Sequence, residues 1–199
     1  MVARWQAWCC RRTIELTRDE AAALDRADAL AAFRERFVLP DDVIYLDGNS
    51  LGPLPKATPA RVAQVVGQEW GQSLIRSWTD HGWIDLQFRV GEKIGRLIGA
   101  APGTTVVADS TSVNLFKLLA AALDHRPGRS VVLTEEGNFP TDLYVAQGLM
   151  ALLQRGYELR PVPAARLAEA LDRQVAVLML THVNYRSGAM QLRGSIRLH

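Results

Sequence analysis

Short apolar runs alternate with longer amphipathic runs between residues 105 and 181. The pattern predicts strands at 105–108, 131–134, 158–161 and 175–181, separated by helices at 112–123, 141–154 and 164–172. Parallel strands need crossover connections, which are usually helices, so this alternation favours a largely parallel sheet covered by helices on both faces. The predicted fold class is therefore α/β.

A polar cluster follows three of the predicted strands, at 109–111, 136–142 and 181–185. In open parallel sheets, ligands bind beyond the carboxyl ends of the strands. We therefore expect a ligand site at these clusters.

The first cluster, Asp109, Ser110 and Thr111, joins a strand to a helix. Unpaired amides and the positive end of the helix dipole favour an anion at such a joint, and the two hydroxyls add donors for a phosphate. The alternative is that Asp109 or Ser110 simply caps the helix, which is a common use of these residue types.

The second cluster adds an aromatic ring, Phe139, and a carboxylate, Asp142. No strand is followed by a G-x-x-x-x-G-K-[ST] or G-x-G-x-x-G motif, which argues against a nucleotide. A phosphate site beside an aromatic ring suits pyridoxal phosphate, because a protein must hold that cofactor's phosphate and stack on its ring. Alternatively, Phe139 is a core aromatic packed beside Pro140.

The residues before 105 predict helices at 19–37, 59–74 and 88–98, a strand at 43–46 and a tight loop at 47–53. Trp70, Trp78 and Trp83 are interpreted as packing residues. A chain of 199 residues that is 48% hydrophobic can build one core of ordinary domain size. We expect an N-terminal arm and helix at 1–40, then one domain at 41–190.

Composition argues against several classes of function. The net charge is only +2 and basic residues are scattered, so nucleic acid is not indicated. No apolar run approaches membrane-spanning length and no signal peptide is evident, so we expect a cytoplasmic protein without a membrane partner. Cys9 and Cys10 are adjacent, which suits neither a disulfide scaffold nor a metal knuckle, and no metal site is predicted.

Five blocks of this sequence resemble the bacterial kynureninase family, in the family's order. They are YLDGNSLG at 45–52, LIRSW at 74–78, DSTSVNLFK at 109–117, NFPTDLY at 138–144 and LTHVNYRSG at 180–188. The resemblance covers about residues 37 to 190 and matches only the amino-terminal half of the family. Residues 191–199 form a divergent tail.

The resemblance implies an aspartate aminotransferase-like fold (fold type I), a homodimer and pyridoxal 5'-phosphate as cofactor. It implies hydrolysis of L-kynurenine or 3-hydroxykynurenine to L-alanine and anthranilate or 3-hydroxyanthranilate, in tryptophan catabolism and NAD biosynthesis. The implied substrate-binding residues are Ser50 and Trp78, and the implied cofactor-binding residues are Ser110, Thr111, Phe139, Pro140, Thr141, Asp142 and Thr181.

The chain departs from the family at the lysine that carries the cofactor as a Schiff base. In the family that lysine, with an aspartate and a histidine near the pyridine ring, follows the segment that matches up to Met190. Lys56, Lys93 and Lys117 stand in unrelated contexts. We expect a truncated or frameshifted product with no catalytic residue of its own and little activity alone, because both the tether and the nitrogen's partner are missing.

Two alternatives stay open. One is another pyridoxal-phosphate enzyme of the same fold, such as a cysteine desulfurase, although the blocks at 48–52 and 182–185 count against it. The other is a non-catalytic remnant that binds a partner, because half of a two-faced sheet exposes apolar surface, and large exposed patches mark interaction sites.

Overall fold

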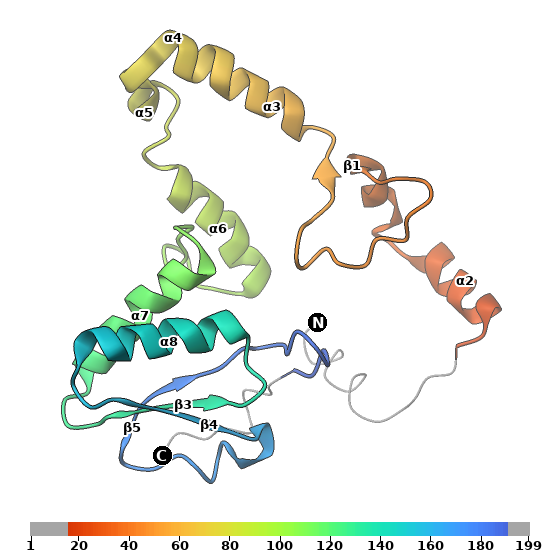
Figure 1. The fold of residues 1–199 in the computed structure, drawn as a ribbon. Coiled ribbons are helices and arrows are strands. Elements are labelled where there is room, and N and C mark those ends of the chain that lie inside the picture. Colours follow the sequence, from red (N-terminus) through yellow and green to blue (C-terminus); the bar gives the residue numbers. More distant parts are fainter. Residues whose placement is uncertain (1–15, 191–199) are drawn as a thin grey trace. The chain divides into compact units, whose positions relative to one another are not determined.

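The computed structural model describes residues 16–190, which fall into two compact units that divide between Asp85 and Leu86. Figure 1 traces the chain through both. Cys9 and Cys10 of the predicted arm, and the divergent tail at 191–199, lie outside the described residues. The predicted domain limits at residues 40 and 190 stay predictions.

The first helix among the described residues of the first unit is α2 (Arg18–Ala27). The Thr17 hydroxyl accepts from the Glu20 amide at 3.3 Å, and the Glu20 carboxylate accepts from the Thr17 amide at 2.9 Å, which is a reciprocal capping box. The predicted helix at 19–37 is correct up to residue 27 and wrong beyond it. Asp28 accepts from a backbone amide two residues on, which competes with helical pairing, and a 3-10 helix, η1 (Ala31–Arg36), follows.

Two short strands come next, β1 (Phe37–Val38) and β2 (Leu54–Pro55), which pair antiparallel. The predicted strand at 43–46 is wrong. Those residues form an irregular loop, because the ladder in this region runs between β1 and β2 instead.

The rest of the first unit is mainly a helical segment whose hydrogen-bonding pattern changes from α to π and back to α. α3 (Thr58–Gln64) continues as a π-helix, η2 (Val65–Trp70), and then as α4 (Gly71–Ser73), which confirms the helix predicted at 59–74. At Leu74 φ is +50°, which a leucine rarely adopts, and the helix ends there. A 3-10 turn, η3 (Leu74–Arg76), and α5 (Ser77–Asp80) follow.

The three tryptophans of this unit differ in environment. Trp83 is half-buried and donates its indole N–H to Glu69, a buried carboxylate, at 2.7 Å. Trp70 and Trp78 are 59% and 50% exposed. The packing interpretation therefore holds for Trp83 and not for the other two within this unit.

The second unit contains a parallel sheet with the strand order β4-β3-β5. β3 (Val131–Glu135) lies between β4 (Glu158–Val162) and β5 (Val175–Met179). Its helices are α6 (Leu86–Ile98), α7 (Thr111–His125) and α8 (Pro140–Leu153). The α/β class and these six elements are therefore confirmed. Within residues 16–190, no helix is both long and apolar enough to cross a membrane.

Two predicted elements of this unit are wrong. Residues 105–108 form no strand but lie against α6, where Val107 N donates to Gln87 O at 3.3 Å. Gly91 permits this approach, because a Cβ there would lie 2.2 Å from Thr105 O. The predicted helix at 164–172 is a single 3-10 turn, η4 (Ala164–Arg166), followed by other turns.

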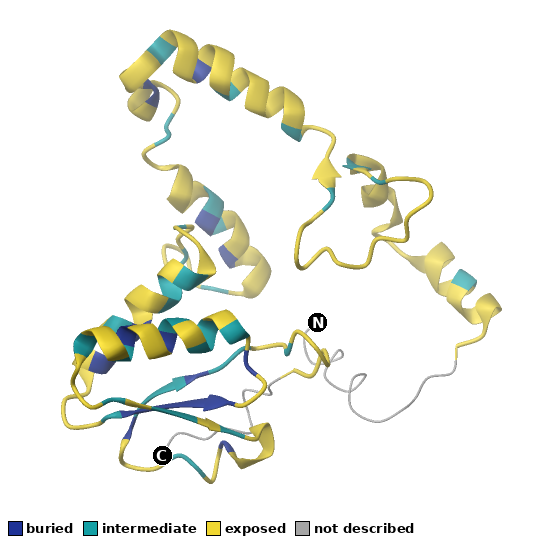
Figure 2. Cartoon of the chain, viewed as in Figure 1, coloured by how far each residue is buried: buried dark blue, intermediate teal, exposed yellow. Residues whose placement is uncertain are grey.

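The central strand β3 is buried along its whole length (Figure 2). On one face it packs against α7 and α8, in a cluster made by Leu119, Leu123, Val132, Ala146, Leu149 and Met179. On the other face the cluster is Val131, Leu133, Leu167 and Val175. Because close-packed interiors are rigid, these two clusters, one on each face of the sheet, hold the ends of the strands in place.

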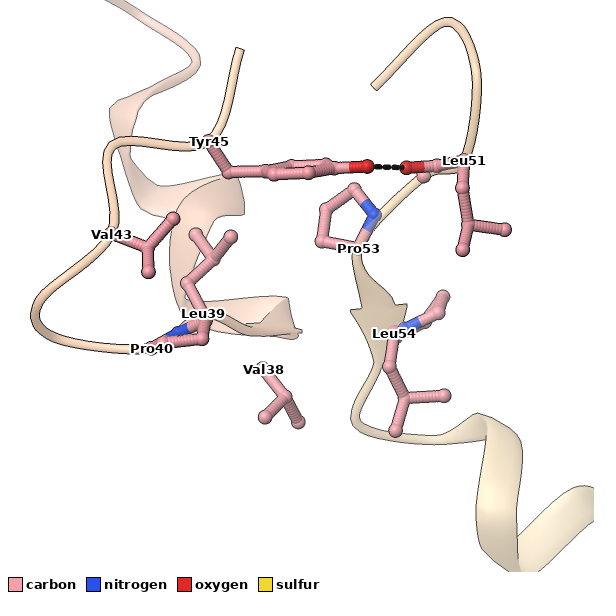
Figure 3. Close-up of a pocket in the computed structure, with 10 residues that line it drawn as sticks. Val38, Leu39, Pro40, Val43, Tyr45, Leu51, Pro53 and Leu54 are labelled. Atoms are coloured by element: carbon pink, nitrogen blue, oxygen red, sulfur yellow. Dashed lines mark hydrogen bonds between the residues drawn. The ribbon is translucent and has the colours of Figure 1, made fainter. Parts of the chain in front are cut away.

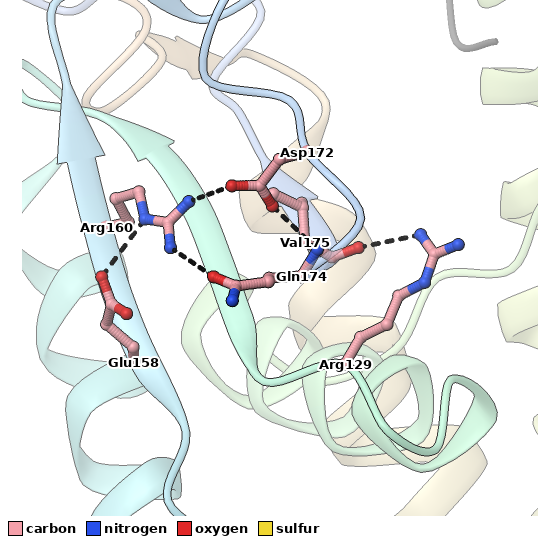
Figure 4. Close-up of polar contacts among 6 residues, drawn as sticks. All are labelled: Arg129, Glu158, Arg160, Asp172, Gln174 and Val175. Carbon is pink, nitrogen blue, oxygen red and sulfur yellow. Dashed lines mark hydrogen bonds and ion pairs between the residues drawn. The ribbon is translucent and has the colours of Figure 1, made fainter.

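Arg160 ties β4 to the turn before β5 (Figure 4). Its guanidinium donates to Glu158 at 3.2 Å, to Asp172 at 2.8 Å and to the Gln174 side chain at 3.3 Å. Asp172 also accepts from the backbone N–H of Gln174 at 2.8 Å. That amide and Arg160 lower the pKa of the Asp172 carboxyl.

We expect Asp172→Asn to remove part of the acid sensitivity of the fold. A carboxyl whose folded-state pKa is lowered stabilises the fold above its unfolded pKa and loses that contribution as pH falls through the folded value. Thermal melts from neutral to acid pH should therefore converge for the wild type and the variant. A constant difference across the range would contradict this.

Candidate functional site

The carboxyl ends of β3 and β5 lie at the same edge of the sheet, because the two strands are parallel. The chain leaves β3 through residues 136–139 and enters α8, and it leaves β5 through residues 180–185. In Figure 1, α7 and α8 both begin at the end toward which the strands point. Two of the predicted polar clusters therefore follow neighbouring strand ends, and the third opens α7.

A buried amide, Asn138, joins these two segments. Its Oδ1 accepts from the Phe139 amide at 2.7 Å and from the Thr181 hydroxyl, and its Nδ2 donates to Thr134 Oγ1 at 3.1 Å. Asn138 is only 4% exposed. Asn138 thus brings together the predicted residues Phe139 and Thr181, although the sequence did not single it out. The available signal was that Asn side chains often hydrogen-bond to neighbouring backbone groups.

Phe139 presents its ring rather than burying it, since the residue is 44% exposed. Its ring meets that of Tyr185 edge to face, with centroids 5.0 Å apart and an interplanar angle of 75°. The Tyr185 loop is held by Asn184, whose Nδ2 donates to Gly137 O at 3.0 Å. Within this unit, the alternative that Phe139 is a core residue is therefore wrong.

Pro140, Thr141 and Asp142 form the first turn of α8. Proline suits this position because its missing N–H would have no helical partner. Thr141 is exposed, whereas Asp142 is partly buried and donates its amide to Phe139 O at 3.0 Å. Burial raises the pKa of the Asp142 carboxyl, so its charged form is disfavoured where it stands.

We expect Asp142→Asn to stabilise the fold at neutral pH. A carboxyl with a raised folded-state pKa costs stability above its unfolded pKa, and this cost vanishes at acid pH, where the group is protonated in both states. The melting temperature should rise at pH 7 and match the wild type in acid. If Asp142 contacts the cofactor, cofactor affinity should fall in the same variant, which would separate a binding role from a structural one.

Ser110 and Thr111 start α7. The Ser110 hydroxyl accepts from Val113 N at 3.4 Å, so it caps the helix as the alternative interpretation expected. Its proton stays available to an acceptor. Asp109 has φ of +44° and pairs with Lys117, which holds the turn before the helix.

These residues fit pyridoxal phosphate in chemical type. Ser110 and Thr111 are exposed hydroxyls at the amino end of a 15-residue helix, where amides and the helix dipole favour a phosphate. Phe139 supplies an aromatic side chain outside the core. The Thr181 hydroxyl proton, in contrast, is already used by Asn138. Within residues 16–190, no group of His, Cys, Asp and Glu could hold a metal ion.

Ser50 and Trp78 belong to the first unit, and the other predicted site residues belong to the second. Ser50 is exposed, and its hydroxyl donates to Asp47 Oδ1 at 2.7 Å. Tyr45 closes this loop by donating its hydroxyl to Leu51 O at 2.5 Å (Figure 3).

An apolar pocket of about 540 Å³ adjoins the loop that carries Ser50. It is lined by Val38, Leu39, Pro40, Val43, Tyr45, Leu51, Gly52, Pro53, Leu54 and Pro55. Its wall therefore comes from β1, β2 and the loop between them, and the ring of Tyr45 forms one side.

No protein-family model matches the chain, but several known proteins that share one name are similar to it. A protein named kynureninase from Burkholderia pseudomallei (strain 1106a) is 57% identical over 179 residues, which are 87% of this chain and 43% of that protein. Over the same shares of both chains, kynureninases from Burkholderia mallei (strain SAVP1) and Pseudomonas fluorescens are 56% and 53% identical. The chain is therefore similar in sequence to proteins named kynureninase, and it spans less than half of their length.

Proposed function

We propose that the protein is a kynureninase-like hydrolase that depends on pyridoxal 5'-phosphate, and that residues 16–190 belong to its amino-terminal part. The proposed reaction cleaves L-kynurenine or 3-hydroxykynurenine to L-alanine and anthranilate or 3-hydroxyanthranilate. The observation that carries the proposal is identity of 53–57% over 179 residues to proteins named kynureninase. The position of two of the matching blocks, 138–144 and 180–188, after the parallel strands β3 and β5 supports it further.

The wider properties of the family are part of this proposal. The parallel sheet β4-β3-β5, with α7 and α8 on one face, is compatible with the aspartate aminotransferase-like fold. We also propose a homodimer and a cytoplasmic enzyme of tryptophan catabolism, as in the family that the sequence resembles.

In this proposal the hydroxyls of Ser110 and Thr111, with the first amides of α7, hold the phosphate. Phe139 stacks on the pyridine ring, and Thr181 with the first turn of α8, residues 140–142, supplies the other contacts. When bound, the cofactor acts as an electron sink for the amino-acid substrate. The exposure of Phe139 and the partial burial of Asp142 support these roles.

Ser50 and Trp78 are proposed to contact the substrate. Both have exposed side chains. Asp47 accepts from the Ser50 hydroxyl, which fixes the hydroxyl oxygen as an acceptor toward a substrate donor group.

The test is anthranilate release from L-kynurenine by the protein at its natural length. We expect fluorescence of anthranilate to rise with protein concentration, to fall when the cofactor is removed, and to return when pyridoxal phosphate is added. A stripped and reloaded sample that releases no anthranilate would contradict the proposal.

The polypeptide of residues 1–199 alone should release none. Its lysines are Lys56, Lys93 and Lys117, none in a block that matches the family's cofactor lysine, and Lys117 is already paired with Asp109. Anthranilate release by this polypeptide, after host enzyme is excluded, would show that a lysine within it can serve.

A further inference from the structure

The hydrogen bonds of Asn138 fix the orientation of its side-chain amide. A backbone N–H can only donate, so the Asn138 atom that lies 2.7 Å from Phe139 N is the carbonyl oxygen. The NH₂ group then points the other way and donates to Thr134 Oγ1 at 3.1 Å. This assignment follows from the backbone and needs no choice between two equivalent flips.

The same carbonyl oxygen contacts the hydroxyl of Thr181. Because an amide oxygen only accepts, Thr181 must be the donor in this contact. A hydroxyl has a single proton, so Thr181 keeps only its lone pairs for anything else that approaches. Thr181 can therefore accept a hydrogen bond from a ligand but cannot give one.

We propose that Asn138 is a positioning residue that sets Thr181 as a hydrogen-bond acceptor and holds Phe139 at the start of α8. The inference rests on the proposed pyridoxal-phosphate site and sharpens it. Phosphate oxygens are acceptors, so Thr181 does not bind the phosphate. It recognises a neutral hydrogen-bond donor of the bound molecule, such as a ring hydroxyl.

Burial explains why the side-chain amide of Asn138 can fix Thr181 as a hydrogen-bond acceptor toward a ligand. Asn138 is 4% exposed and Thr134 is fully buried, so water does not compete for their hydrogen bonds. Turning the amide over would place its NH₂ group against the Phe139 N–H and leave buried donors unpaired, which is costly. Thr181, in contrast, is partly exposed and can be reached by a ligand.

The test compares Thr181→Val with Thr134→Val in the protein at its natural length. Each variant removes one hydroxyl partner of Asn138. A merely structural role would make the loss at least as large in Thr134→Val, because Thr134 is fully buried and water cannot replace its hydroxyl. We expect only Thr181→Val to weaken pyridoxal phosphate binding, by about three- to tenfold, the usual range for a neutral hydrogen bond. Thr181→Ser should restore the affinity.

Two probes separate the possible results. The first probe is inorganic phosphate, whose oxygens accept hydrogen bonds, whereas Thr181 needs a donor from the ligand. The affinity of the protein for inorganic phosphate should therefore not change in Thr181→Val. Exchange of the Phe139 amide proton, measured without ligand, should accelerate in Asn138→Ala and not in Thr181→Val.

Equal loss of pyridoxal phosphate affinity in the two valine variants, or loss of inorganic phosphate affinity in Thr181→Val, would overturn this inference alone. An unchanged exchange rate of the Phe139 amide in Asn138→Ala would do the same. Failure of the wild-type protein to bind pyridoxal phosphate would overturn the proposed cofactor site together with it.

Discussion

Leu133→Ala should lower the free energy of unfolding of the second unit by about 2 to 5 kcal/mol, the usual cost of removing a buried leucine side chain. Leu133 has no exposed surface and lies in the central strand β3. It packs with Leu167 and Val175 on the face opposite α7 and α8. A rigid neighbourhood cannot collapse into the space that the side chain leaves, so a cavity term adds to the lost burial.

Leu152→Ala is the matched control, because Leu152 is the same residue type on α8 and is 70% exposed. Its cost should stay within about 0.5 kcal/mol, as for most surface substitutions. Chemical denaturation of both variants, followed by circular dichroism, measures the difference. Equal losses would mean that β3 is not the centre of the core.

The sequence was sufficient to predict the elements that bury most apolar surface. The strands near 131, 158 and 175 and the helices α7 and α8 were found because a buried strand appears as a short apolar run and a covering helix as a longer amphipathic one. Asp28 shows why boundaries are harder to predict: a single side-chain hydrogen bond replaces helical pairing there.

The two wrong strand predictions share a physical origin, which is that a strand needs a partner that a local pattern does not reveal. Residues 105–108 have the apolar character of a strand but lie against α6, where Gly91 allows the close approach. Residues 43–46 have no strand partner, because the strands that pair in this region are β1 and β2. At 164–172 the apolar spacing suits a helix, yet only Leu167 becomes fully buried and the chain turns instead.

The sequence predicted the residues of the candidate site but not the hydrogen bonds that join them. The sequence indicated Phe139 and Thr181 separately, and the structure joins them through Asn138, whose role depends on contacts 43 residues apart. It also indicated Ser110 as either a cap or a phosphate ligand. The structure has it as a cap, and a capping oxygen that only accepts leaves the hydroxyl proton for a phosphate, so the two roles are compatible.

Ser110→Ala/Thr111→Ala should weaken pyridoxal phosphate binding by at least roughly tenfold in the protein at its natural length. Hydrogen bonds to charged groups contribute about 1.5 to 3 kcal/mol each, and water replaces only part of that. The amides and dipole of α7 remain, so affinity should fall without being abolished. The measurement is a titration of cofactor-free protein followed by cofactor absorbance, with the melting temperature taken beside it.

The single variants and one control divide this effect into binding and capping. Ser110→Ala should lose both affinity and about 1 kcal/mol of stability, because its oxygen caps α7. Thr111→Ala should lose affinity with little change in stability. Thr17→Ala removes the comparable cap of α2 in the other unit and should lower stability alone. If the double variant loses stability as Thr17→Ala does but binds the cofactor like the wild type, Ser110 and Thr111 only cap the helix and the phosphate is held elsewhere.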